Sequence, residues 1–180
     1  MIDNLESLKY PVGKFTSPTQ IGEVNLAEAI AYLKKFPQLL SDAVANLDDE
    51  QFNTPYREGG WTVKQLVHHI ADSHMNAYIR FKLALTEESP VIKPYQEASW
   101  AELKDSQITE VKVSLQLLGL LHQRWTNLIE SMSDEDFKRT YMHPQYQTIT
   151  PLWNALALYY WHSRHHLAHI TSLKNRLKWN

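Results

Sequence analysis

Apolar residues recur with the 3.6-residue period of an α-helix in four long stretches of this chain. Few segments show the alternation of apolar and polar residues that is typical of a half-buried strand. The pattern therefore predicts four helices, over residues 25–46, 62–86, 106–131 and 150–177, with a long connection over residues 88–105.

Local signals mark where these helices begin. Two pairs have the spacing of a capping box, Asn25 with Glu28 and Thr62 with Gln65. Thr150 followed by Pro151 is typical of an N-cap and a first-turn proline. Pro37 lacks the amide hydrogen that a helix interior needs, so we expect the first helix to kink or restart there.

The segments after the first and third helices resemble each other, as Leu47-Asp-Asp-Glu-Gln-Phe52 and Met132-Ser-Asp-Glu-Asp-Phe137. This similarity divides the chain into two helix pairs, each joined by an acidic turn and a loop. A chain of 180 residues fits one domain with a sizeable core. We therefore predict an all-α fold, a four-helix bundle forming a single domain over residues 1–180, with any metal site on facing helices.

The composition of the chain limits which metal ligands, cellular location and partners are expected. The chain has no cysteine, so a metal would be held by imidazole or carboxylate, and a reducing, cytoplasmic location is expected. The first fifteen residues lack the apolar run of a signal peptide, and no stretch approaches the length of a membrane span. The net charge of −2, without any Lys/Arg cluster, makes nucleic acid an unexpected partner.

Histidines gather on the second predicted helix. Helical rotation places His74 inside its apolar stripe, His69 at the edge and His68 outside. His69 heads a row that continues through Ser73, Asn76 and Arg80 and forms a polar strip, which could line a pocket or face solvent.

A second cluster lies on the fourth helix, where His162 and His166 fall within the buried stripe four residues apart. This is the spacing of paired ligands in HExxH zinc sites, although the catalytic glutamate of that motif is missing here. Two buried neutral histidines without a metal remain an alternative. His165 points away from the stripe, His169 lies at its edge, and His122 on the third helix is expected in the core.

Acidic residues are scarce near this cluster, because no Asp or Glu occurs from Phe137 to Asn180. Asp72, three residues after His69, is the nearest acid in sequence. It is a candidate acid, base or orienting group, or it faces solvent.

Two motifs carry a family resemblance, Gly59-Gly-Trp-Thr-Val-Lys-Gln-Leu-Val-His-His-Ile-Ala-Asp-Ser-His74 and Tyr160-Trp-His-Ser-Arg-His-His-Leu-Ala-His-Ile170. With them the chain resembles the YfiT branch of the DinB/YfiT-like superfamily. The resemblance implies a four-helix bundle, often a homodimer, with one zinc or nickel ion per chain. It selects His69, eight residues after Trp61, together with His162 and His166 as ligands. His169 is then a substrate contact or a support for a ligand.

The resemblance also implies a function, namely metal-dependent hydrolysis of a small-molecule substrate by activated water. An alternative is transfer of a low-molecular-weight thiol such as bacillithiol to an electrophile, with Arg80 or Arg164 holding the carboxylates of the thiol cofactor. A third hypothesis is a structural ion in a non-catalytic stress-response module, which would need a fourth ligand from His165, His169 or His122.

Overall fold

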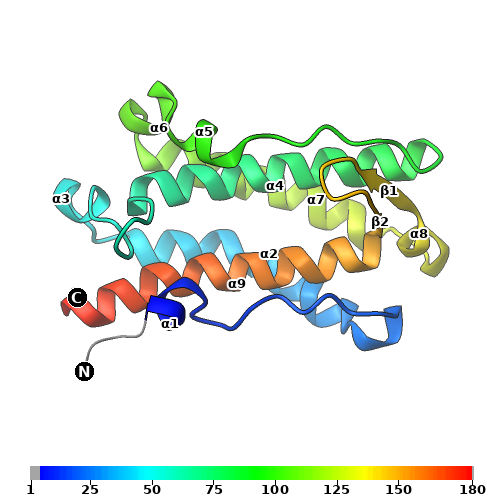
Figure 1. Cartoon of the computed structure of the whole chain (residues 1–180), viewed down its shortest axis with the longest axis horizontal. Coiled ribbons are helices and arrows are strands. Elements are labelled where there is room, and N and C mark those ends of the chain that lie inside the picture. The colour runs from blue at the N-terminus through cyan, green and yellow to red at the C-terminus, as the bar shows by residue number, and fades with distance from the viewer. Residues whose placement is uncertain (1–4, 180) are drawn as a thin grey trace.

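The computed structural model describes residues 5–179, and four long helices dominate it (Figure 1). Their bounds are Leu26–Val44 for α2, Val63–Thr86 for α4, Val111–Glu130 for α7 and Leu152–Leu177 for α9. Helices α2 and α4 each pack against both α7 and α9, so α2 and α4 occupy opposite corners of the bundle. The predicted four-helix bundle is confirmed. None of the described helices combines the length and apolar character needed to cross a membrane.

Helix α2 continues through Pro37, so a restart at this residue is wrong, whereas a kink, the other expectation, stays a prediction. Pro37 has no amide hydrogen to donate to the Leu33 carbonyl one turn earlier. A buried carbonyl without a donor would cost about 1–3 kcal/mol. His122 of α7 supplies the missing donor, because its Nδ1 lies 2.7 Å from the Leu33 oxygen. A tertiary contact thus replaces the helical hydrogen bond.

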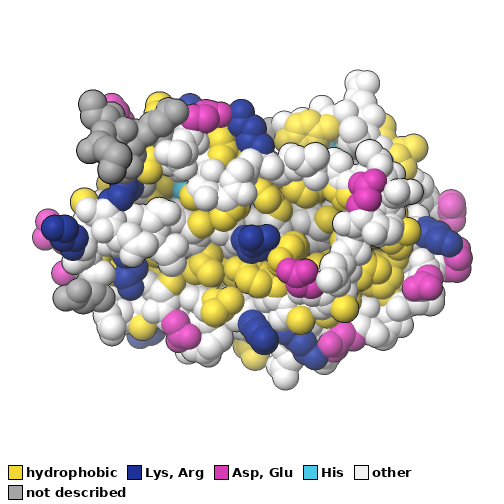
Figure 2. All heavy atoms as spheres, turned by 90° about the horizontal axis from the view of Figure 1, so that it is seen from below, with side chains coloured by type: hydrophobic (Ala, Val, Ile, Leu, Met, Phe, Trp, Pro, Cys, Tyr) yellow, Lys and Arg dark blue, Asp and Glu magenta, His cyan; other side chains and the backbone are white. Residues whose placement is uncertain are grey.

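The amino-terminal segment lies along the outer side of α9 and contains α1 (Leu5–Lys9) and the 3-10 helix η1 (Ile21–Glu23). Trp161 donates from Nε1 to the Gly13 carbonyl at 3.0 Å. Tyr10 lies beside His165, with ring centroids 6.2 Å apart. His165 is only 8% exposed, although the helical pattern placed it away from the buried stripe. Figure 2 shows the face of the molecule on which the amino-terminal segment lies, and very little histidine surface is visible there.

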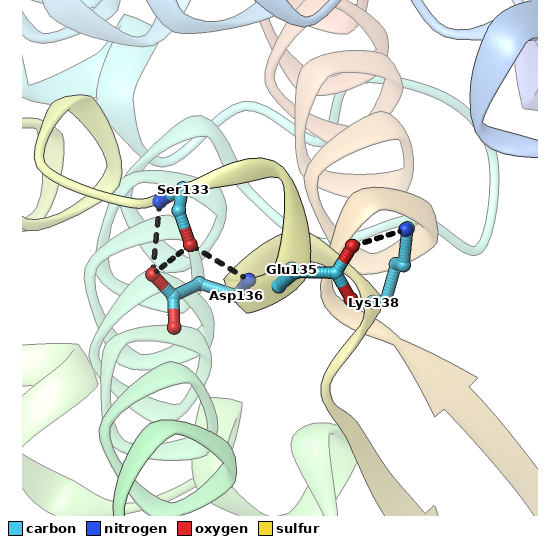
Figure 3. A network of polar contacts seen from close by, with 4 residues as sticks. All are labelled: Ser133, Glu135, Asp136 and Lys138. Carbon is cyan, nitrogen blue, oxygen red and sulfur yellow. Dashed lines mark hydrogen bonds and ion pairs between the residues drawn. The ribbon is translucent and has the colours of Figure 1, made fainter.

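The two acidic segments form the short helices α3 (Asp49–Phe52) and α8 (Asp134–Lys138), each begun by a capping box. In α8 the Ser133 amide donates to the Asp136 carboxylate at 2.8 Å, and the Asp136 amide donates back to the Ser133 hydroxyl at 3.3 Å (Figure 3). Lys138 pairs with Glu135 on the exposed side of the same turn. The internal similarity in sequence therefore reflects similar local structure.

The helix predicted over residues 106–131 is interrupted. Helix α6 (Lys104–Ile108) is followed by two extended residues before α7 begins. The Ser106 hydroxyl donates to the Trp100 carbonyl at 3.2 Å, which ties α6 to α5 (Glu97–Ala101). Ile108, an apolar residue inside the predicted helix, is 66% exposed. The packing of α6 outweighs the apolar period at this boundary.

An antiparallel hairpin of β1 (Thr140–His143) and β2 (Thr148–Pro151) precedes α9. Pro151 pairs with Thr140 and has extended backbone at the N-cap, so the predicted N-cap at Thr150 and first-turn role of Pro151 are wrong. The β-branched run over residues 148–150 favours a strand. That preference decides the local structure, and α9 begins one residue after the proline.

Two apolar clusters fill the bundle, and buried histidines lie between them. His74 contacts Phe36 of one cluster and Trp125 of the other, with ring centroids 5.5 and 5.8 Å apart. His122, predicted to lie in the core, is 1% exposed. These buried histidines form a polar layer between the two apolar clusters.

Candidate metal centre

Three histidines from two neighbouring helices meet at one point. His69 lies on α4, and His162 and His166 lie one turn apart on α9. One ring nitrogen of each lies within 4.8 Å of the others, and the Nε2 atoms of His162 and His166 are 3.1 Å apart. Tyr159 ties the two helices together here, because its hydroxyl donates to the Ser73 carbonyl at 3.1 Å.

Burial keeps these three rings neutral at physiological pH. It lowers the pKa of His69 to about 4. Burial, together with the neighbouring histidines, holds the pKa values of His162 and His166 well below the usual range. Neutral imidazole is the form that binds a metal ion. Each ring can therefore offer a lone pair at neutral pH without first losing a proton.

A chain of hydrogen bonds fixes which nitrogen of His162 carries the proton. The Leu33 carbonyl can only accept, so His122 carries its hydrogen on Nδ1 and is free to accept at Nε2. His74 donates to that atom from Nδ1 at 2.7 Å, which makes its own Nε2 an acceptor. The Nδ1 of His162 lies 3.3 Å from this acceptor and takes the donor role. The Nε2 of His162 is left with a lone pair facing His166.

The separation between the ring nitrogens of His162 and His166 suits a tetrahedral ion. Zinc binds histidine nitrogen at about 2.0–2.1 Å, so two nitrogens on one tetrahedral zinc lie about 3.3 Å apart. The separation of 3.1 Å between the Nε2 atoms of His162 and His166 is close to this value. Without an ion, the Nε2 of His166 can donate a hydrogen bond to the Nε2 of His162, and a cation between the two atoms would replace that hydrogen bond by coordination. The donor set therefore fits a divalent ion.

The loop before α4 packs Trp61 against His69, with ring centroids 4.6 Å apart. Gly59 has a φ of +64°, in the left-handed region that favours glycine. A Cβ at Gly60 would lie 2.9 Å from the Cγ of Arg57. The two glycines therefore allow the tight turn that places Trp61 over the histidine ring.

Two cavities share His162 and Glu97 in their walls. The first has a volume of about 430 Å³ and is also lined by Trp61, His69 and His166. The second, of about 460 Å³, is bounded by α4, α9, the hairpin and residues 94–98. Ser73 and Arg80 of the predicted polar strip line the second cavity, which agrees with the pocket role considered for that strip.

Glu97 is the feature that sequence reasoning missed. Among the described residues it is the only carboxylate that lines either of these two cavities. It lies in the first turn of α5, inside the long connection, and is exposed. No spacing rule links it to the histidines, because only the folded chain brings this connection to the centre.

The other predicted acid, Asp72, does not line the two cavities. It is half-buried, and burial followed by the charge of Asp105 raises its pKa to about 6. Arg164 is exposed and lies 5.1 Å from the ring centroid of Tyr160, outside both cavities. Arg80 is the candidate arginine that lines one of them.

His165 and His169 face each other, with their Nε2 atoms 3.0 Å apart, and His169 stacks on Tyr56 at 4.1 Å. With His166 they form a second group of converging nitrogens among the described residues. His68, predicted to lie outside the buried stripe, is 6% exposed because α7 covers it, and its Nδ1 lies 2.7 Å from the Ser114 hydroxyl.

Residues 32–170, which include all of α4 and α7 and most of α2 and α9, match the DinB superfamily. The chain belongs to this superfamily. YfiT of Bacillus subtilis is 51% identical over 174 residues, covering 97% of this chain and 98% of that protein. A Bacillus licheniformis member is 49% identical over 176 residues, covering 98% and 100% of the two chains.

Two solved structures agree with the fold. That of Bacillus subtilis YfiT, described as a probable metal-dependent hydrolase with an unusual four-helix bundle topology, matches with a TM-score of 0.94 and 50% identity over 97% of this chain and 99% of that chain. A mycothiol-dependent maleylpyruvate isomerase matches with a TM-score of 0.64 at 18% identity, covering 87% and 63%. The second match concerns the fold alone.

Proposed function

We propose that this protein is a metal-dependent hydrolase in which His69, His162 and His166 hold one divalent ion per chain. The observation that carries the proposal is the convergence of three neutral ring nitrogens where two cavities share a wall. The description of its YfiT relative as a probable metal-dependent hydrolase supports it. We propose zinc, with nickel as the alternative, because imidazole suits both ions.

A divalent ion bound there would supply Lewis acidity, which lowers the pKa of coordinated water to about 7 in the most active zinc sites. Three protein ligands leave one tetrahedral position open. The chain itself supplies preorganisation, because His162 and His166 share one helix and His74 holds the ring of His162. Little rearrangement is then needed when the ion binds.

Glu97 is the proposed proton carrier. A hydrolase needs a group that takes a proton from the nucleophile and returns it to the leaving group. Glu97 lines both cavities and belongs to a connection that is separate from the bundle helices. Its exposure lets it exchange protons with solvent.

A panel of esters and amides, assayed with zinc-loaded protein, tests this proposal. Glu97→Gln should lower kcat about 10²- to 10⁴-fold while the protein keeps its metal. Glu88→Gln, an exposed carboxyl outside both cavities, is the matched control and should leave kcat unchanged. Absence of turnover by fully loaded wild-type protein across the panel would contradict the proposal.

Transfer of a low-molecular-weight thiol is the second candidate, favoured by the presence of two cavities at one centre, which gives room for two reactants. The distant structural neighbour is described as mycothiol-dependent. Consumption of a reactive electrophile with and without bacillithiol separates the two candidates. Turnover only with the thiol would replace hydrolysis by transfer as the proposed reaction.

A purely structural ion has less support. His122 cannot serve as a fourth ligand in this arrangement, because its two nitrogens bond to the Leu33 carbonyl and to His74. Neither His165 nor His169 belongs to the group of converging nitrogens that His69, His162 and His166 form.

A further inference from the structure

The cavity between α4, α9 and the hairpin contains an arginine without an anionic partner. Arg80 makes no ion pair with any described Asp or Glu, and its Nε is buried without a hydrogen-bond partner. Glu97, the one described carboxylate in the cavity wall, is exposed. A buried guanidinium donor without an acceptor is costly, which indicates that a ligand supplies the acceptor.

Two further polar atoms of the same cavity lack partners. The Tyr95 hydroxyl and the Nδ1 of His143 are both buried without a hydrogen bond of good geometry. Ser73 lies near enough to the Tyr95 hydroxyl to oppose the rise of its pKa, although burial dominates and keeps the phenol protonated. Burial, with the charge of Arg80 adding to it, lowers the pKa of His143, so this ring is neutral. Both groups can act as hydrogen-bond donors.

The charge of the cavity favours a monoanion. Arg80 is the one cationic side chain in its wall and Glu97 the one anionic side chain, among the described residues. A phosphate dianion would meet too little positive charge, whereas a carboxylate matches the planar fork of a single guanidinium in two parallel hydrogen bonds.

We propose that this cavity is a carboxylate-binding subsite, in which Arg80, helped by Tyr95 and His143, holds one end of a small organic acid whose other end reaches His162. Ser73 contacts Tyr159 of α9. Arg80 follows Ser73 by seven positions on α4, which corresponds to a rise of about 10 Å along the helix axis. The carboxylate and the reacting group are therefore separated by a chain of several atoms. The proposal rests on the metal-dependent function only for the second end of the ligand.

Binding of pentanoate to metal-free protein, followed by NMR titration, tests the subsite without the ion and therefore independently of the hydrolase proposal. Pentanamide is the neutral isostere, and inorganic phosphate is the competing anion. Pentanoate should bind at least about tenfold more tightly than pentanamide, because the amide cannot form a charge-assisted pair. Equal binding of acid and amide, or tighter binding of phosphate, would overturn the assignment.

Arg80→Gln should weaken pentanoate binding at least about tenfold. Arg164→Gln is the matched control, because Arg164 is exposed and outside the cavity, and it should leave binding unchanged. If Arg80→Gln fails to fold, Tyr95→Phe removes one orphaned donor without changing the charge and should weaken binding severalfold. Unchanged pentanoate binding in the folded Arg80 variant, or in Tyr95→Phe where it replaces that variant, would overturn the proposal.

The carboxylate could belong to a hydrolysable acid or to a thiol. The same titration on zinc-loaded protein, with 5-mercaptopentanoate beside pentanoate, separates these sources. Tighter binding of the mercapto acid would assign the subsite to a thiol carboxylate, and equal binding would assign it to a hydrolysable acid. Loss of pentanoate binding on zinc loading would contradict a subsite beside the metal centre.

Discussion

His122 supplies the hydrogen bond that Pro37 withholds from α2. The acceptor is the Leu33 carbonyl, 2.7 Å from the Nδ1 of His122. Because this bond fixes the proton of His122, it also sets the donor and acceptor roles of His74 and then of His162. An irregularity in one helix is thereby coupled to the proposed metal centre on the opposite side of the core.

The first prediction concerns this coupling. His122→Leu leaves the Leu33 carbonyl and the His74 Nδ1 without partners, and the free energy of unfolding should fall by about 2–5 kcal/mol. Pro37→Ala returns an amide hydrogen to the Leu33 carbonyl. It should therefore raise stability by about 1–3 kcal/mol more in the His122→Leu background than in the wild type.

Urea unfolding of the four metal-free proteins measures this double-mutant cycle. Strictly additive effects would show that Pro37 and His122 do not compete for one acceptor.

The second prediction concerns His74, a positioning residue for His162. His74→Phe keeps an aromatic ring of similar shape but removes the acceptor for the Nδ1 hydrogen of His162. Loss of such a support typically lowers metal affinity about 10- to 100-fold. Competition with a chelating dye measures the affinity, and nitrogen NMR of the metal-free protein reports the His162 tautomer.

His68→Phe is the control for this experiment, because His68 is also buried on α4 but bonds to Ser114. It should leave the affinity and the His162 tautomer unchanged. An unaltered tautomer in His74→Phe would contradict the hydrogen-bond chain.

The third prediction concerns Asp72. Burial raises the pKa of this carboxyl to about 6, so the folded state disfavours its charged form at pH 7. Asp72→Asn should therefore raise the free energy of unfolding, by at most about 1 kcal/mol because solvent screens a half-exposed group. Metal content and kcat should not change. A large fall in kcat would show that Asp72 reaches the reaction centre.

The fourth prediction concerns pH. Burial lowers the pKa values of His69, His122 and His165 to about 4 from 6.5. Above pH 6.5 these rings are neutral in both the folded and the unfolded state, so their titration does not change the free energy of unfolding in that range. Between pH 6.5 and 4 the unfolded chain binds protons that the folded chain does not. Each histidine then lowers stability by up to about 1.4 kcal/mol per pH unit.

Asp72 acts in the opposite direction below pH 6, because its folded-state pKa is raised and the folded chain holds the extra proton. Three histidines outweigh one carboxyl, so the metal-free protein should lose stability as the pH falls from 6.5 to 5. Urea unfolding at several pH values measures the slope. Constant stability over this range would contradict the assignment of buried neutral histidines.

Periodicity and capping signals predicted much of the fold because they act within one helix. The capping box of Thr62 with Gln65 forms as expected, and α4 ends at Thr86 as the pattern indicated. The errors arose where another element decides the local structure. Pro37 stays helical because His122 reaches across from α7, and His165 is buried because the amino-terminal segment covers α9.

The site residues, too, could be predicted where the signal lies within one helix and not where another element places them. The four-residue spacing of His162 and His166 predicts their proximity, since both lie on one helix. Helical rotation alone did not separate His69 from its neighbours, and the choice came from family resemblance. Glu97 lies in an irregular connection whose position depends on α5 packing against α4, which is why local signals could not predict its approach.

The most direct test of the central claim is the metal content of purified protein. Wild-type protein should carry about one divalent ion per chain, as expected for a three-histidine site. His69→Ala, His162→Ala and His166→Ala should each lose it, whereas the controls His165→Ala and His68→Ala should keep it. Full metal retention in any of the first three variants would contradict the proposed ligand set.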